Sequence, residues 1–441
     1  MDGEQKTVSF YTLGCKLNQA ETSAIRNKFD QNGFTIIPFG KSSDITIINT
    51  CIVTNRAAKK SRNIIRQAKR ISPDGKIVAV GCYSQVDWKK LKNITEIDMI
   101  LGNKEKFQII ENLAKLGEDD NLKIAVDTIK SDEYFEKEFT STTERTRAIL
   151  KVQTGCDKFC SYCIVPYARG LPASRNFTNS VNEAKDLVKN GFKEIVLTGI
   201  DIGSYFYKGK KLIDLIREIE KIDGIKRIRI SSIELNSLSD ELILHIANSK
   251  IAAPHFHLSL QSGSDEILKK MRRRYSTADF FKKVNFIRKH IPNVSIGTDV
   301  IVGFPGESEE LFNETYEFIK KVRFNHLHIF RYSRKEGTPA AKMPDQVDEK
   351  LKKRRSKKLR ELEIILKTEY IKKFFGENVS VLWEKYDGVF LSGLSEHYLK
   401  VKAKAEVKAE VEVKSKKSLV NEFSNVYIID GNVDHLEGKI G

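Results

Sequence analysis

Short apolar runs of strand length alternate with longer amphipathic stretches through most of this chain, and the alternation limits the folds it can adopt. In the first 116 residues the apolar runs are 8–13, 45–48, 77–80 and 99–101, and helical patterns such as 17–31 and 55–71 lie between them. Strands that alternate with helices form βαβ units, whose strands pair in parallel. The sequence therefore predicts a parallel α/β sheet domain, which we place at residues 6–118.

The same alternation resumes after a charged, weakly periodic connector at 117–144, in which we expect some strand. Six further apolar runs are 149–152, 195–197, 228–230, 256–260, 296–302 and 326–330, with a helical pattern between consecutive runs. Six β/α units favour a partial (β/α)6 barrel, although periodicity alone does not separate it from a doubly wound sheet. We place this domain at 142–373, with a trailing helix at 342–373 that carries 12 basic and 6 acidic residues.

The last 66 residues, 376–441, read as short strands separated by turns. Apolar residues at every second position from Val401 to Val413 predict a hairpin, since side chains alternate between the faces of a strand. A small β-barrel is the expected fold. Its 9 basic and 11 acidic residues give a net charge of −2, although Lys400, Lys402, Lys404 and Lys408 could form a basic face.

Composition restricts the classes of function. The chain has 76 Lys or Arg and 59 Asp or Glu, and the net charge of +17 favours an anionic partner, nucleic acid before membrane. No apolar run approaches the roughly 20 residues that span a bilayer, and residues 1–7 are polar, so a cytoplasmic protein is expected. Six cysteines in 441 residues are too few for a disulfide scaffold.

Three of the cysteines, Cys156, Cys160 and Cys163, form a CxxxCxxC loop directly after the first strand of the middle domain. Three thiolates on one short loop can bind three irons of a cubane iron–sulfur cluster and leave the fourth iron open to a substrate. The alternatives are a zinc knuckle that lacks its fourth ligand, or three unrelated thiols. Zinc sites usually show two ligand pairs, so the spacing favours the cluster.

The other three cysteines, Cys15, Cys51 and Cys82, each follow an apolar run, in VSFYTLGC, ITIINTC and KIVAVGC. The carboxyl ends of parallel strands share one edge of a sheet, so the three loops can bring these thiols together. Separately buried thiols are the alternative, because free cysteine is often buried. The same placement after three strands favours a second iron–sulfur cluster.

The loop TGCDKFCSYC is similar to the signature of radical S-adenosylmethionine enzymes, with the aromatic Tyr162 before the last cysteine. The resemblance implies a partial (β/α)6 barrel, an open iron chelated by the methionyl amine and carboxylate, and reductive cleavage to a 5′-deoxyadenosyl radical. It also assigns cofactor-binding residues by motif. Gly199 would lie near the methionine, and the cofactor pocket would be lined by Ser231, Glu234, Gln261, Ser262 and Asp299.

Two three-cysteine sites that use every cysteine resemble the methylthiotransferases, over essentially the whole chain. TLGCKLNQAE, NTCIVTNRAAKKSR and VGCYSQ are similar to that family's N-terminal domain, FRYSRKEGTPA and PGES to its barrel, and 376–441 to its tRNA-gripping TRAM domain. TLGCK and NTCxVTN are closer to the branch that acts on threonylcarbamoyladenosine beside the tRNA anticodon than to the isopentenyladenosine branch. The branch that modifies an aspartate of a ribosomal protein is less similar.

The resemblance also implies cofactors and partners. These are two 4Fe–4S clusters, S-adenosylmethionine, tRNA and a small-protein electron donor, with no catalytic side chain beyond the cluster ligands. One S-adenosylmethionine would methylate sulfur on the N-terminal cluster, and a second would be cleaved at the barrel cluster. A monomer without membrane contact is expected.

A basic run follows one of the N-terminal cysteines. Seven Lys or Arg and no acidic residue lie between 55 and 70, and Arg56, Lys59, Arg62 and Arg66 are the candidate RNA contacts. The alternative is a solvated helix face, and residues 269–274 form another positive block. A non-catalytic iron–sulfur or zinc protein that binds RNA and senses redox state is the rival function, but it would not need residues such as Gly199 and Asp299 at the strand ends.

Overall fold

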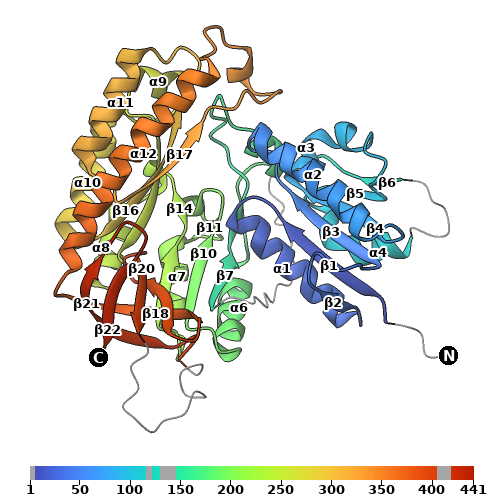
Figure 1. The fold of residues 1–441 in the computed structure, drawn as a ribbon, viewed down its shortest axis with the longest axis horizontal. Helices are drawn as coiled ribbons and strands as arrows, with labels where there is room; N and C mark the ends of the chain where they lie inside the picture. The colour runs from blue at the N-terminus through green and yellow to red at the C-terminus, as the bar shows by residue number, and fades with distance from the viewer. Residues whose placement is uncertain (1–4, 116–121, 130–145, 405–418) are drawn as a thin grey trace.

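The computed structural model describes residues 5–115, 122–129, 146–404 and 419–441. Its N-terminal part is a six-stranded parallel sheet with the strand order β2-β1-β3-β4-β5-β6, covered by helices on both faces (Figure 1). The strands are β1 (Thr7–Thr12), β2 (Thr35–Ile37), β3 (Ile45–Thr50), β4 (Lys76–Gly81), β5 (Met99–Leu101) and β6 (Lys123–Ala125). The helices are α1 (Lys16–Gln31), α2 (Asn55–Ile71), α3 (Cys82–Leu91), the 3-10 helix η1 (Glu105–Gln108) and α4 (Ile109–Ala114). The predicted parallel sheet is confirmed.

Burial explains this local structure. All six residues of β3 are buried, as expected for a central parallel strand covered on both faces. Helix α2 buries Ala58, Ser61, Ile64, Ile65 and Ala68, at helical spacing, and its basic residues occupy the remaining faces. The short edge strands of the sheet are β2, which sequence periodicity did not predict, and β6, which lies beyond residue 118 in the connector where some strand is expected.

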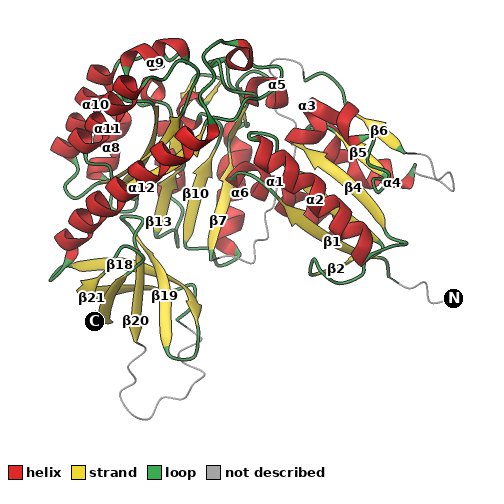
Figure 2. Ribbon diagram, turned by 45° about the horizontal axis from the view of Figure 1, so that its top comes forward, coloured by secondary structure: helices red, strands yellow, loops and turns green. Residues whose placement is uncertain are grey.

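The middle part has the six parallel strands expected of a partial (β/α)6 barrel. They are β7 (Arg147–Lys151), β10 (Glu194–Thr198), β13 (Arg227–Ile230), β15 (His255–Gln261), β16 (Ser295–Val302) and β17 (His326–Arg331), and the short β14 (Ser232–Ile233) joins β15 after β13. The outer helices are α6 (Phe177–Lys189), α7 (Leu212–Glu220), α8 (Asp240–Asn248), α10 (Thr277–His290) and α11 (Glu309–Val322), with the short α5 (Val165–Arg169) and α9 (Asp265–Lys270) at strand ends. Helix α12 (Glu349–Ile371) packs along β17 (Figure 1) and ends beside the C-terminal strands (Figure 2).

The C-terminal part is a closed five-stranded barrel with the order β18-β19-β20-β22-β21. Its strands are β18 (Asn378–Tyr386), β19 (Phe390–Ser395), β20 (Lys400–Lys404), β21 (Phe423–Gly431) and β22 (Leu436–Ile440), around the buried Trp383. The predicted small barrel is confirmed. The predicted hairpin continues from β20 into residues 405–413, which lie outside the described residues, as does Lys408.

This small barrel docks on the (β/α)6 barrel through buried charges. Glu194 on β10 accepts hydrogen bonds from Arg227 (3.2 Å) and Arg229 (3.0 Å), and both arginines also donate to C-terminal carbonyls. Arg147 pairs with Glu384 at 2.7 Å. Acidic residues of the C-terminal barrel thus face cations of its neighbour, which accounts for part of its negative charge. Within the described part of the chain, no helix has the length and apolar character to cross a membrane.

Candidate functional site

The CxxxCxxC loop lies at the end of the first barrel strand. Gly155, just before it, has a φ of +72°, and a Cβ there would stand 1.9 Å from the carbonyl oxygen of Leu171, so only glycine fits. Ser161 anchors the loop by donating its N–H to Met271 O (3.1 Å) and its hydroxyl to Lys270 O (2.7 Å). Burial raises the pKa of the Cys163 thiol to about 12, because the charged thiolate is disfavoured in the interior. A bound metal ion replaces the proton and stabilises the thiolate.

Arg273, which belongs to the positive block at residues 269–274, joins this loop to a predicted cofactor residue. Its guanidinium donates to Cys160 Sγ (3.3 Å), to the Glu234 carboxylate and to Ser259 O (3.1 Å), and its side chain is 3% exposed. Burial raises the pKa of Glu234 and Arg273 acts against that rise. The arginine therefore holds a carboxylate that is only 18% exposed next to a thiol of the loop.

Three of the remaining predicted cofactor residues lie at a cavity of about 190 Å³ beside the loop. The cavity is lined by Tyr162, Gln261 and Asp299 together with Cys163. Gly199 packs so closely that a Cβ would lie 2.8 Å from Gln153 Oε1, which accepts hydrogen bonds from the N–H groups of Ile200 and Asp201.

The two serines behave differently. The Ser231 hydroxyl is buried and has no hydrogen-bond partner among the described residues. The Ser262 hydroxyl is 3.1 Å from that of Thr315 on α11 and accepts from Ser264 N (3.2 Å), so it is occupied within the protein. A buried hydroxyl without a partner is rare and is compatible with a polar ligand. Three thiols on one loop, a cavity beside them and this free hydroxyl fit a cluster with an open iron and a bound S-adenosylmethionine.

Three side chains on adjacent strands meet at the wall of this cavity, and two of them are histidines that no sequence pattern singled out. Asp299 Oδ1 lies 2.9 Å from His257 Nε2 and 3.1 Å from His328 Nδ1. These hydrogen bonds hold the pKa of Asp299 well below its usual range, against the effect of burial. The three groups are close enough to share one cation or to share protons. His328 also lines the larger cavity described next, so these three side chains lie where the two cavities adjoin.

The N-terminal cysteines converge as predicted. Cys15, Cys51 and Cys82 all line a cavity of about 1220 Å³ between the N-terminal sheet and the barrel. Gly14 and Gly81, which precede two of them, have φ angles of +99° and +96°, and a Cβ on Gly14 would stand 3.1 Å from Cys51 Sγ. The glycines therefore turn the chain sharply at the strand ends and let the cysteine loops approach each other.

The predicted RNA-binding residues differ in their surroundings. Arg56, Lys59 and Arg66 are exposed, and only Arg56 lines the large cavity. Arg62 is half-buried and donates to the Tyr83 hydroxyl at 2.8 Å, while Arg66 lies 3.8 Å from Glu96.

The basic residues of α12 also divide into two groups. Lys353 and Arg360 are exposed at the large cavity, facing the end of α2 that carries Arg56. Arg355 is buried against Glu307 at 2.7 Å and is not available to RNA.

Comparison with known proteins agrees with this geometry. Residues 150–319 match the radical SAM superfamily, and residues 7–102 match a family described as Uncharacterized protein family UPF0004. The chain is 41% identical over 405 residues to the threonylcarbamoyladenosine tRNA methylthiotransferase MtaB of Bacillus subtilis, covering 90% of each protein. The chain belongs to the radical S-adenosylmethionine methylthiotransferase family. The rival hypothesis of a non-catalytic redox sensor is therefore set aside.

Other relatives of this methylthiotransferase bear on its branch and its fold. The MtaB protein of Aquifex aeolicus is 41% identical, with 90% of this chain and 96% of that protein covered. A tRNA-2-methylthio-N(6)-dimethylallyladenosine synthase of Acetivibrio thermocellus is 36% identical, with 87% and 81% covered. The radical S-adenosylmethionine methyltransferase TsrM of Kitasatospora setae shares the fold, with a TM-score of 0.54 at 13% identity over 74% of this chain and 73% of that one.

We expect the substitution Arg273→Gln to lower reductive formation of 5′-deoxyadenosine more than ten-fold. The change leaves buried Glu234 without its cation and Cys160 without its donor, and one charged hydrogen bond is worth about 1.5–3 kcal/mol. The measurement is 5′-deoxyadenosine released by dithionite-reduced enzyme. The control is Arg274→Gln, an exposed neighbour, which should stay within about two-fold of the parent because exposed charges contribute little. Equal losses in both variants would contradict the role of Arg273.

Proposed function

We propose that this protein attaches a methylthio group to carbon 2 of threonylcarbamoyladenosine in tRNA. The observation that carries the proposal is that both three-cysteine sites open on adjoining cavities, since Val53, Val165 and Phe330 line both. A nucleoside in the larger cavity would have sulfur chemistry on one side and radical chemistry on the other. The identity of 41% to two MtaB proteins, against 36% and 38% to two tRNA-2-methylthio-N(6)-dimethylallyladenosine synthases, supports this branch.

A radical route suits this substrate. The carbon–hydrogen bond at carbon 2 is unactivated, so acid–base catalysis at neutral pH is of little use. S-adenosylmethionine, cleaved at the barrel cluster, supplies the radical chemistry. The chain's own residues bind and orient the reactants and exclude water, and we assign no catalytic side chain beyond the cluster ligands. Tyr162, Gly199, Ser231, Glu234, Gln261, Ser262 and Asp299 remain the proposed cofactor-binding residues.

We further propose that Cys15, Cys51 and Cys82 bind a second 4Fe–4S cluster. Their convergence on one cavity supports this, because three thiols that line the same space can share a cluster. The protein would act in the cytoplasm as a monomer, with electrons from a small protein. The proposed domains are 6–118, 142–373 and 376–441, although strand β6 continues the first sheet beyond its proposed limit.

The tRNA would enter along the mouth of the large cavity. Arg56, Lys59, Arg62 and Arg66 of α2 are the proposed contacts, joined by Lys353 and Arg360 of α12. Of these six, Arg56, Lys353 and Arg360 are both exposed and at the cavity. Exposed cations on two helices that border one cavity suit neutralisation of backbone phosphates near the target nucleoside.

Nucleoside mass spectrometry tests the substrate. In tRNA from a strain that lacks the enzyme, we expect threonylcarbamoyladenosine without its methylthio form. The parent gene should restore the modification, and the Cys51→Ala variant should not. If isopentenyladenosine is left unmodified instead, the branch is wrong but the reaction class holds. If all methylthio groups of the tRNA are still present and a ribosomal-protein aspartate has lost its methylthio group, the proposed RNA substrate is wrong.

Iron analysis tests the two clusters. Anaerobically reconstituted protein should contain about eight iron atoms, falling to about four in each triple-alanine variant, Cys15/Cys51/Cys82 or Cys156/Cys160/Cys163. Cys160→Ala should abolish 5′-deoxyadenosine formation, whereas Cys51→Ala should retain it and lose only the methylthio product. Four iron atoms in the unmutated protein would rule out the second cluster.

The dependence of tRNA binding on salt tests the proposed RNA-binding residues. Replacing Arg56, Lys353 and Arg360 with glutamine should weaken binding and reduce the slope of log K against log salt by roughly one unit for each phosphate that the variant no longer neutralises. The matched control replaces three exposed lysines away from the cavity, Lys208, Lys210 and Lys211. A slope that falls equally in both triple variants would argue against a binding surface at the cavity mouth.

A further inference from the structure

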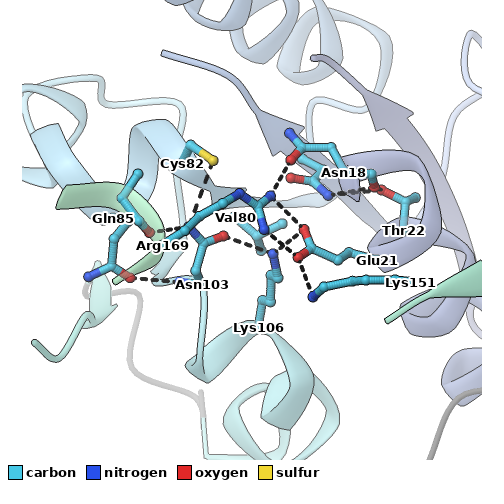
Figure 3. A network of polar contacts seen from close by, with 12 residues as sticks. Asn18, Glu21, Thr22, Val80, Cys82, Gln85, Asn103, Lys106, Lys151 and Arg169 are labelled. Atoms are coloured by element: carbon cyan, nitrogen blue, oxygen red, sulfur yellow. Dashed lines mark hydrogen bonds and ion pairs between the residues drawn. The ribbon is translucent and has the colours of Figure 1, made fainter. Parts of the chain in front are cut away.

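A buried cluster of charges lies where the N-terminal sheet meets the (β/α)6 barrel (Figure 3). The Glu21 carboxylate on α1 accepts from Lys106 (2.6 Å), Lys151 (2.8 Å) and Arg169 (2.7 Å). All four side chains are at most 3% exposed, and each comes from a different element. Three cations therefore surround one anion in the interior.

Amide side chains connect this cluster to the loops of two N-terminal cysteines. Asn18 Oδ1 accepts from Arg169 at 2.6 Å, and its amide nitrogen donates to Leu13 O (2.7 Å) and Thr50 O (3.2 Å). These carbonyls lie just before Cys15 and Cys51 in the chain. Arg169 thus fixes, through one asparagine, the backbone of both loops.

A second asparagine reaches the third thiol. Asn103 donates to Cys82 Sγ (3.8 Å) and to the Ala168 carbonyl (2.7 Å), and its own oxygen accepts from Lys106 at 2.8 Å (Figure 3). Each of the three cysteine loops therefore has a hydrogen-bonded connection to the charge cluster. Arg169 also belongs to α5, which begins directly after the CxxxCxxC loop, and it lines the large cavity with the three cysteines.

The charge of Arg169 is tied to the thiols as well as to Glu21. Taking a guanidinium out of water costs several kcal/mol unless anions lie beside it. Burial disfavours the charge on Arg169, but Cys82, Glu21 and Cys15 outweigh burial and raise its pKa well above the usual range. When the cysteines bind iron they do so as thiolates, which add negative charge to the cavity that Arg169 lines.

We propose that Arg169 is a positioning residue that raises the reduction potential of the N-terminal iron–sulfur cluster, by stabilising the extra negative charge of its one-electron-reduced form. The inference rests on the second cluster of the proposed function. Nearby charge and hydrogen bonds around the ligands are the means by which a protein sets the potential of such a cluster. The same side chain connects the cluster's loops to α5, and so to the radical site.

The test is a potentiometric titration followed by electron paramagnetic resonance, in the full chain with Cys156, Cys160 and Cys163 replaced by alanine. This background leaves only the N-terminal cluster, which takes one electron from the titrant. In Arg169→Gln, the ratio of reduced to oxidised cluster at the parent's midpoint potential should fall about ten-fold, or about 59 mV for one electron. In Glu21→Gln, which removes the anion, the ratio should rise. Arg169→Lys, which retains the charge, should stay close to the parent.

The control is Arg288→Gln, which removes an arginine that donates to the carbonyls of Val322 and Arg323 and does not line the cavity of the cysteines. The reduction potential of the N-terminal cluster should not change in this variant. An unchanged or higher potential in Arg169→Gln, with four iron atoms still bound, overturns the inference. If Arg169→Gln fails to bind iron, the Glu21→Gln variant decides: a higher potential supports the inference and an unchanged or lower one overturns it. Fewer than four iron atoms in the background protein itself would instead mean that the proposed second 4Fe–4S cluster does not form.

Discussion

The common direction of parallel strands decides where this protein can do chemistry. Strands β1, β3 and β4 pair in parallel, so the cysteines that follow them emerge at one edge of the sheet. The barrel strands are parallel as well, and the loop with the other three cysteines follows β7 at the same end as the residues after β15 and β16. With the two carboxyl edges facing one another, Cys15, Cys51 and Cys82 line one cavity, and Cys163 of the CxxxCxxC loop lines the adjoining one.

Buried ion pairs then fix the positions of side chains that the backbone alone does not determine. Arg273 holds Glu234 beside Cys160, and Arg169 holds Glu21 and Asn18 beside the N-terminal cysteines. Such pairs are weak sources of stability, because desolvation offsets most of the attraction. Their directional hydrogen bonds do confer geometry, since a buried guanidinium must place each N–H on an acceptor. Both arginines are thus better understood as positioning groups than as stabilising ones.

Sequence reasoning succeeded where a local pattern carried the information. Strand and helix periodicity predicted the parallel sheet, the six-strand barrel and the small β-barrel, and the placement of cysteines after apolar runs predicted their convergence. It missed β2, because this edge strand of three residues has no buried position to leave a periodic signal, and it expected strand in the connector without locating β6. It also missed His257 and His328, which meet Asp299 only because β15, β16 and β17 are neighbours in the sheet.

Net charge shows most clearly why composition is an incomplete guide. The excess of +17 favoured an anionic partner, yet many of the cations are internal and cannot contact one. The cations whose side chains are at most 4% exposed, and that pair with carboxylates at most 18% exposed, are Arg169, Arg227, Arg229, Arg273, Arg355, Lys106 and Lys151. The acidic residues of the C-terminal barrel are likewise used in part against its neighbour, as Glu384 is with Arg147. The proposed RNA contacts are therefore a narrower set, the cations of α2 and α12. Those at the cavity mouth lie beside the cysteines, where a bound phosphate would also place the nucleoside.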